Sequence, residues 1–247
     1  MSLIITIHTN EGIIMASDSR TTFNKQDFSP LPDGKGAIIT NNQGVHYTDT
    51  TNKTFLSKNN IGISTCGAAA INGKPIAGYI EEFLNSKVFS DTKATEVAKL
   101  ILDEFRSFSP IPDVIFHIAG YETDGDILRQ RFFRVFVSIN KTVEIDVTSQ
   151  GAAWNGETEI LSRIINPYWT ELKKPDGTVT YEKHNAPPIP WNFFSLQDAI
   201  DFSKYAMNTT IETMRFQERL KTVNAPIDIL AIKPTGAFWV QKKELHA

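Results

Sequence analysis

Cysteine is almost missing from this sequence, with Cys66 alone in 247 residues. No intrachain disulfide can form, which excludes a disulfide scaffold and predicts a reducing, cytoplasmic setting. Basic residues are in slight deficit, with 25 Lys and Arg against 28 Asp and Glu, for a net charge of −3. General nucleic-acid binders usually carry a basic excess, so no nucleic-acid partner is expected.

Long hydrophobic runs are also missing. A membrane span needs about 18 consecutive apolar residues, and the longest runs here are far shorter. The first residues, MSLIITIHTNEG, have no basic segment or long apolar core, so neither a signal peptide nor a membrane partner is expected. Hydrophobic residues still make up 41% of the chain, which favours a folded globular protein. We expect a soluble cytoplasmic enzyme or an assembly subunit.

Apolar patterns predict blocks of strands separated by helices. The expected strands are residues 3–8, 13–17, 53–57, 61–66, 114–121, 131–139, 142–148, 227–232 and 237–241. Three- and four-residue apolar spacing predicts helices over 73–87, 91–108, 157–165 and 195–220. This order does not alternate strand and helix. It predicts an α+β fold, a four-layer α/β/β/α sandwich of two mainly antiparallel sheets.

Two segments interrupt this pattern. Residues 23–35 are rich in Asn, Asp, Pro, Gly and Lys and are expected to form a loop, followed by a small hairpin over 37–48. Residues 170–193 are proline-rich and contain the turn Pro175-Asp176-Gly177, which predicts an extended insertion with a hairpin. No repeat or linker divides the chain, so residues 1–247 are expected to form a single domain.

Ser2 is the first candidate for chemistry. Removal of Met1 would leave it with a hydroxyl and a free α-amine, whose pKa of about 7.7–8.0 suits a general base at neutral pH. Serine is common at this position, so the residue alone carries little weight.

Asp18 and Lys53 are the next candidates. Asp18 ends an apolar strand, where a carboxylate is costly unless it is paired. A buried Lys53 would pair with it and lower the pKa of a nearby nucleophile. The ordinary alternatives are a turn-capping aspartate, a salt bridge from Asp18 to Arg20, and an exposed lysine on an edge strand.

Gly67 follows Cys66 where a strand turns toward a helix. Its backbone N–H is placed to donate to an oxyanion, although a tight turn alone would also explain the glycine. Cys66 is expected to be buried and inert, because no histidine has a suggestive spacing.

Together these residues resemble the β-type subunits of the proteasome and their bacterial ring relatives, which are N-terminal-nucleophile (Ntn) hydrolases. Ala16–Arg20 is similar to the stretch "A-[ST]-[DE]-x-R" of that family. Lys53 precedes a short apolar strand, and Gly62–Gly67 is similar to "G-I-x-x-x-G". The chain is longer than typical members between Asp18 and Lys53, which implies an insertion at about 24–48.

The resemblance implies a set of site residues. The catalytic set would be Ser2, Asp18, Lys53, Gly67 and Asn155, with Asn155 in place of the serine that helps to hold the terminal amine. The substrate-binding set would be Arg20, Thr22 and Cys66. The family's upstream aspartate and serine have no clear match, and Glu218 and Thr222 lie nearest to them.

The implied activity is hydrolysis of peptide or small amide bonds by Ser2, without cofactor or metal. The implied partners are the substrate, copies of the chain in a homo-oligomeric ring, and an unidentified regulatory partner. Two alternatives stay open. One is a non-catalytic ring subunit that retains Met1, and the other is an amidohydrolase for a small molecule.

Overall fold

Two five-stranded sheets form the centre of the molecule. The computed structural model describes residues 2–31 and 37–244. The first sheet has the order β12-β1-β2-β15-β16, with the strands Gly151–Gly156, Leu3–Thr9, Gly12–Ser17, Asp228–Lys233 and Gly236–Gln241. The second has the order β11-β10-β9-β6-β5, with the strands Lys141–Glu144, Ile127–Phe136, Val114–Asp124, Gly62–Gly67 and Thr54–Leu56. All neighbouring strands in both are antiparallel, which confirms the predicted α+β fold with mostly antiparallel sheets.

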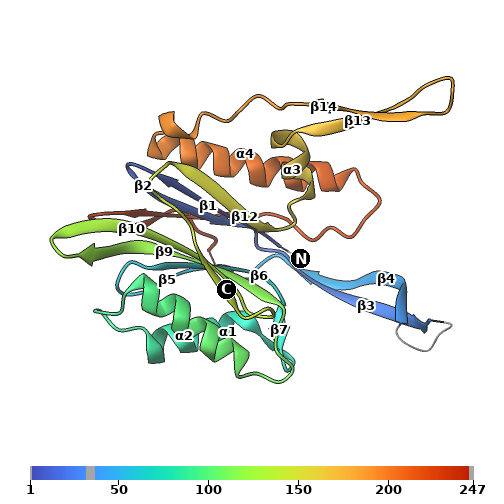
Figure 1. Cartoon of the computed structure of the whole chain (residues 1–247). Helices are drawn as coiled ribbons and strands as arrows, with labels where there is room; N and C mark the ends of the chain where they lie inside the picture. The colour runs from blue at the N-terminus through green and yellow to red at the C-terminus, as the bar shows by residue number, and fades with distance from the viewer. Residues whose placement is uncertain (1, 32–36, 245–247) are drawn as a thin grey trace.

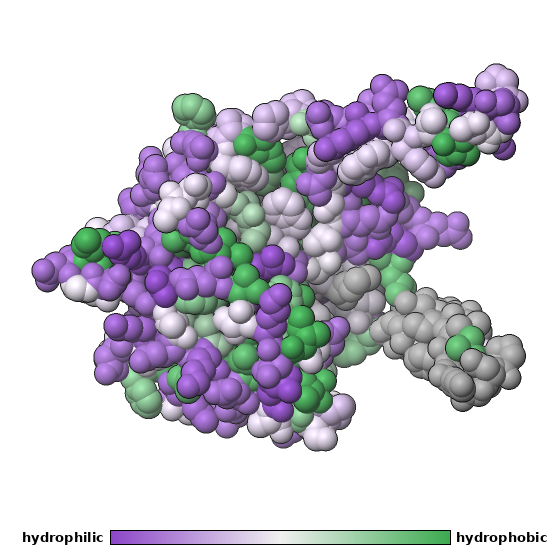
Figure 2. Space-filling view, viewed as in Figure 1, coloured by the Kyte–Doolittle hydropathy of each residue, from purple (hydrophilic) through white to green (hydrophobic). Residues whose placement is uncertain are grey.

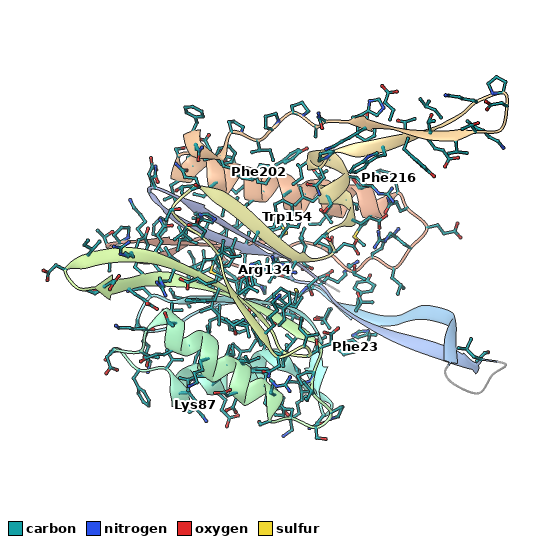
Figure 3. The ribbon with its side chains drawn as sticks, in the orientation of Figure 1. Phe23, Lys87, Arg134, Trp154, Phe202 and Phe216 are labelled. Carbon is teal, nitrogen blue, oxygen red and sulfur yellow. The ribbon has the colours of Figure 1, made fainter. Side chains whose placement is uncertain are left out.

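Helices cover the outer faces of the sheets (Figure 1). The helices α1 (Ile76–Lys87) and α2 (Ala94–Arg106) pack on the second sheet. The helices α3 (Glu159–Ile165) and α4 (Leu196–Arg215) pack on the first, next to a short 3-10 turn at Trp191–Phe193. Figure 3 shows Trp154 of β12 and Phe202 of α4 in this layer.

The core is divided by the sheets. One apolar cluster lies between the second sheet and its helices, another between the first sheet and its helices, and a smaller one lies between the sheets. Every residue of β1 and β2 is buried, because each of these strands has a covered layer on both sides. This explains why their sequences are continuously apolar rather than alternating.

A long hairpin replaces the loop expected at residues 23–35. The strand β3 (Thr21–Pro30) pairs with β4 (Ala37–Thr48), and in Figure 1 the hairpin extends away from the sheets. The predicted small hairpin within 37–48 is therefore wrong. The polar run 41–44 lies within β4 and pairs with residues 24–27, between two shifts of register, so it forms no turn. Residues 32–36 of the expected loop and insertion lie outside the described residues.

A second hairpin lies in the proline-rich segment. It consists of β13 (Tyr168–Lys173) and β14 (Val179–His184) on either side of the Asp176-Gly177 turn. Its side chains are mostly exposed, and Figure 2 shows apolar residues among polar ones near its tip. A further pair of two-residue strands, β7 (Ala70–Ile71) and β8 (Lys74–Pro75), leads into α1.

The longest helix is shorter than its sequence pattern predicts. The helix α4 ends at Arg215, five residues before the expected Leu220, and the chain continues as a loop over 216–227. This loop leads the chain into β15 and contacts the turn after β2, where the Ser19 N–H donates to the Asn224 carbonyl oxygen at 3.2 Å. None of the helices within 2–31 and 37–244 is both long and apolar enough to cross a membrane.

A substitution at Phe116 can test the packing of the core between the second sheet and its helices. It is fully buried and packs edge-to-face on Phe105 of α2, with ring centroids 4.8 Å apart. Replacement Phe116→Ala is expected to lower the free energy of unfolding by about 3–5 kcal/mol, because it opens a cavity that the layer cannot close. Chemical denaturation measures this change. The matched control is Phe193→Ala, at a position 87% exposed, and an equal loss in both variants would contradict the packing described.

Candidate active site at the start of the first strand

Ser2 is held in place by the last residues of β12. It is 7% exposed, and its carbonyl oxygen accepts a hydrogen bond of 2.7 Å from the Glu157 N–H. Gly156 has φ +94°, and a Cβ there would lie 1.7 Å from the Ser2 carbonyl oxygen. Only glycine permits this close approach, so β12 fixes where the first strand begins.

Asp18 and Lys53 form a buried ion pair beside Ser2. The Lys53 Nζ donates to Asp18 Oδ1 at 2.8 Å and also to the Arg20 carbonyl oxygen. The Asp18 carboxylate accepts backbone N–H groups from Leu3 at 3.0 Å, Arg20 at 3.0 Å and Asn224 at 3.3 Å. Neither side chain is more than 4% exposed. Burial lowers the pKa of the Lys53 ammonium, and the Asp18 carboxylate opposes that shift.

Gly67 lies on the other side of Ser2. Its φ is +108°, and a Cβ would lie 2.4 Å from the Asp113 carbonyl oxygen, so the position requires glycine. A narrow cavity brings Ser2, Lys53 and Gly67 together, and Cys66 also lines it. Burial raises the pKa of the Cys66 thiol to about 12, so the thiol stays protonated near neutral pH.

A pocket of about 340 Å³ opens beside Ser2. Its walls are two short segments of the chain and the first residue, namely Arg20–Phe23, Gly67–Ala70 and Ser2. Figure 3 places Phe23 where the β3–β4 hairpin leaves the body of the molecule. The Thr22 hydroxyl donates to the Lys221 carbonyl oxygen at 3.4 Å. The segment after β6 contributes only small residues, which leaves the pocket room for a side chain.

Arg20 lines this pocket, but its guanidinium is already engaged. Its Nε and Nη2 donate to the two oxygens of Asp49 at 2.7 and 2.8 Å. Its Cζ lies 4.2 Å from the centre of the Tyr47 ring. The alternative of a salt bridge to Asp18 is wrong, because Arg20 offers Asp18 only its backbone N–H. The Arg20 side chain therefore lines the pocket as one half of an ion pair with Asp49, not as a free cation.

Asn155 lies between the sheets and is bonded away from Ser2. Its Oδ1 accepts from Arg134 Nε at 2.9 Å and lies 2.9 Å from His117 Nε2. The other nitrogen of His117 lies 2.9 Å from the Thr6 hydroxyl. Figure 3 shows Arg134 in the layer between the sheets. The hydrogen bonds of the Asn155 side chain therefore join the sheets, and none of them reaches the terminal residue as the resemblance implied.

His117 was not singled out in the sequence. It is fully buried, and this burial lowers its pKa to about 3, so the ring is neutral over the physiological range. Strand alternation places it on the inner face of β9, but its partners come from β1 and β12, far away in the chain. No spacing in the sequence predicts that contact.

The loop after α4 completes the site from a third direction. Glu218 is exposed, whereas the buried Thr222 hydroxyl donates to Glu157 Oε2 at 3.4 Å. Arg219 forms an ion pair with Glu157, whose carboxylate is 3% exposed. Asn224 donates from its side chain to Asp49 at 3.1 Å. Glu157 and Arg219 were missed in the sequence, because the two residues are 62 positions apart.

A second buried ion pair lies on the same sheet. Asp228, at the start of β15, accepts from the Lys243 backbone N–H at 2.8 Å and pairs with the Lys243 ammonium. Asp228 lies opposite Ser17 of β2, the residue immediately before Asp18. Among the residues that the structure describes, no three His, Cys, Asp or Glu side chains gather closely enough to hold a metal ion.

Known structures resemble this chain in fold. No family model matches it, and no curated protein matches it by sequence. The solved structure of an Anbu (Gly-1) mutant from Hyphomicrobium sp. strain MC1 is 15% identical, with 98% of this chain and 86% of that chain covered and a TM-score of 0.62. That of Anbu (ancestral beta-subunit) from Yersinia bercovieri is 15% identical, with 98% and 88% covered and a TM-score of 0.60.

The fold is proteasome-like. The prediction that the chain is a homologue of the proteasome β-type subunits is nevertheless wrong. The two solved structures named above are of Anbu, which is proteasome-like but distinct, and no family or curated match supports the expected membership. At 15% identity the likeness extends to the fold alone.

The Asp18–Lys53 pair generates a test of stability. Lys53→Met removes the partner of a buried carboxylate and is expected to lower the free energy of unfolding by about 3–5 kcal/mol. The double variant Asp18→Asn with Lys53→Met is expected to lose less than the sum of the single changes, because no charge is left unpaired. Chemical denaturation of the four proteins closes the cycle. The control is Lys87→Met, whose pair with Glu104 is half-exposed and worth little.

His117 generates a test of pH dependence. Its pKa is about 3 in the folded protein and near 6.5 when unfolded, so the unfolded chain binds a proton that the folded one does not. Stability is therefore full above pH 6.5 and falls as the pH drops toward 3, by up to about 1.4 kcal/mol per unit from this residue. His117→Gln is expected to remove that part of the slope, measured by denaturation at pH 4, 5, 6 and 7. His46→Gln, at an exposed position, is expected to keep it.

Proposed function

We propose that this protein is an amide-bond hydrolase whose nucleophile is the Ser2 hydroxyl, made available with its α-amine by removal of Met1. Met1 itself lies outside the described residues. The observation that carries the proposal is the narrow cavity where Ser2, Lys53 and Gly67 meet, with Asp18 bonded to Lys53 behind it. A nucleophile, its own amine, a buried cation and a glycine N–H in one place match the needs of acyl transfer.

The reaction follows from these groups. The Ser2 Oγ forms a bond to the carbonyl carbon of the substrate, and its proton passes to the Ser2 α-amine. When the C–N bond of the substrate breaks, that proton passes on to the leaving nitrogen. The product left on the enzyme is an ester of Ser2. A water molecule, deprotonated by the same amine, attacks the carbonyl carbon of the ester. The bond from that carbon to the Ser2 Oγ breaks, the amine returns the proton to Oγ, and the acid leaves.

Lys53 and Gly67 supply the electrostatics. The Lys53 ammonium is held close to the site by Asp18 and by the Arg20 carbonyl, and its positive charge favours the ionised form of the nucleophile. The Gly67 N–H is the proposed donor to the oxyanion. A donor of this kind contributes about 2.7–4 kcal/mol in well-studied hydrolases. Thr21 and Cys66 shape the wall of the cavity and take no proton.

The pocket beside Ser2 favours a substrate with an uncharged side chain. Among the described residues that line it, Arg20 alone has a charged side chain, and Asp49 neutralises that charge. Ala68–Ala70 leave space, and Phe23 and Thr22 offer an apolar ring and a methyl group. We therefore favour a peptide with an apolar residue before the scissile bond over a small polar amide.

The wider proposals concern fold and assembly. We propose that the two sheets and their helices form a four-layer α/β/β/α sandwich, in one domain with the hairpins β3–β4 and β13–β14 as insertions. We further propose that the chain acts in the cytoplasm as a homo-oligomer. Copies that retain Met1 would have no free amine at Ser2, and such an assembly would be a non-catalytic subunit.

Ser2→Ala tests the proposed nucleophile. Loss of the hydroxyl is expected to lower the turnover of a fluorogenic peptide at least about a thousandfold, because no ester can form. Ser2→Thr keeps a hydroxyl and is expected to retain turnover within about tenfold. The intact mass of the native protein reports whether Met1 is removed. The intact mass of the protein mixed with a slowly hydrolysed substrate reports whether an acyl group is added to the first residue.

The control for this test is Ser86→Ala, which removes an exposed hydroxyl on α1. Equal turnover in wild type and Ser2→Ala, or Met1 retained in full, would rule out the proposed mechanism. Turnover of small amides without turnover of any peptide would redirect the proposal to a small-molecule amidohydrolase.

A further inference from the structure

Glu157 contacts the first residue of the site through its backbone and carries a buried carboxylate. Its backbone N–H donates to the Ser2 carbonyl oxygen at 2.7 Å, and its side chain is 3% exposed. The carboxylate receives Arg219 and the Thr222 hydroxyl from the loop after α4. The mechanism described above makes no use of these groups.

Such an arrangement is expensive if it serves packing alone. The Glu157 carboxylate is 3% exposed, and taking such an ion out of water costs several kcal/mol even though its partner Arg219 stays 25% exposed. The pair also joins two separate segments of the chain, because Glu157 follows β12 and Arg219 belongs to the loop after α4. Arg219 is also bonded to Glu159 at 3.0 Å, which fixes its position from a second side.

We infer that Glu157 and Arg219 form a positioning pair for the α-amine of Ser2, in which the Glu157 backbone fixes the residue and the two opposite charges set the affinity of the amine for its proton. The inference rests on the proposed function, where this amine is the general base. A general base works best when its pKa lies near the working pH, so nearby charges must be balanced.

Other charged and titratable groups surround Ser2 and contribute to the same balance. They come from the end of β2, the turn before β5, β6 and the layer between the sheets, and they are Asp18, Arg20 with Asp49, Lys53, Cys66 and Arg134. The test therefore changes one member of the Glu157–Arg219 pair at a time and leaves those groups in place.

The two members predict shifts of opposite sign. Glu157→Gln removes a negative charge and leaves Arg219 uncompensated, so the protonated amine is disfavoured and its pKa is expected to fall. Arg219→Gln leaves the Glu157 carboxylate uncompensated, so the pKa of the amine is expected to rise. Each shift is expected to be on the order of half a pH unit. A role in packing alone would not produce opposite shifts.

The experiment uses the full chain with Ser2 as its first residue, prepared by cleaving an N-terminal fusion. The rate at which acetic anhydride modifies the α-amine is followed against pH by mass spectrometry of the N-terminal peptide. The acidic limb of kcat/KM on the fluorogenic peptide is measured in the same variants. Both readouts are expected to shift downward in Glu157→Gln and upward in Arg219→Gln.

Two further variants keep the result interpretable. Arg219→Lys retains the charge and is expected to leave the pKa of the amine near that of wild type, even if the loop is destabilised. Arg163→Gln removes an arginine that bonds Glu159 but not Glu157, and no shift is expected. Glu157→Gln still offers an oxygen to Thr222, so the fold is expected to tolerate it.

Absent shifts, or shifts of the same sign in Glu157→Gln and Arg219→Gln, would overturn the inference. Opposite shifts of the amine in the modification assay support it. Because that assay needs no turnover, a protein without Ser2-dependent hydrolysis but with opposite shifts would refute the proposed function and leave the pair standing. Ser2-dependent hydrolysis with no shifts would do the reverse.

Discussion

The ion pair between Asp18 and Lys53 is the contact on which the site depends. Asp18 follows β2 in the first sheet, and Lys53 precedes β5 in the second, so the pair ties the sheets together at one end. The carboxylate also collects backbone N–H groups from the first strand, the turn after β2 and the loop near Asn224. These bonds offset the cost of burying the charges, and they place three separate segments around Ser2.

Between the sheets, polar groups are paired in a chain that apolar packing alone would not specify. Thr6, His117, Asn155 and Arg134 are linked across the layer, while Thr54 bonds both Ser17 and Ser64 nearby. The bonds that cross from one sheet to the other fix their relative position, because a shift would leave a donor or acceptor unmet. Hydrogen bonds as well as apolar packing therefore determine how the two sheets lie on each other.

Much of the fold could be predicted because its signals are local. The apolar runs of β1 and β2 and the spacing of α1, α2 and α4 depend on neighbours within a few residues. Ser2, Asp18, Lys53 and Gly67 could be named in the sequence because each stands at the end of such an apolar run, at β1, β2, β5 and β6 in turn. The rest could not be predicted, because Glu157 and Arg219, or His117 and Asn155, meet only after the sheets and the last loop have assembled. The β3–β4 hairpin could not be predicted for a different reason. Its polar residues 41–44 are typical of a turn, but in the structure they pair with 24–27 between two shifts of register.

Gly156 has a consequence for how the nucleophile is held. A Cβ at this position would lie 1.7 Å from the Ser2 carbonyl oxygen, so the two backbones touch with no atom between them. The limit that this sets on Ser2 is steric. Repulsion between atoms in contact does not change with ionic strength or with the protonation of any side chain. The charges around the amine are thus free to vary with conditions, while the place of the Ser2 backbone stays constant.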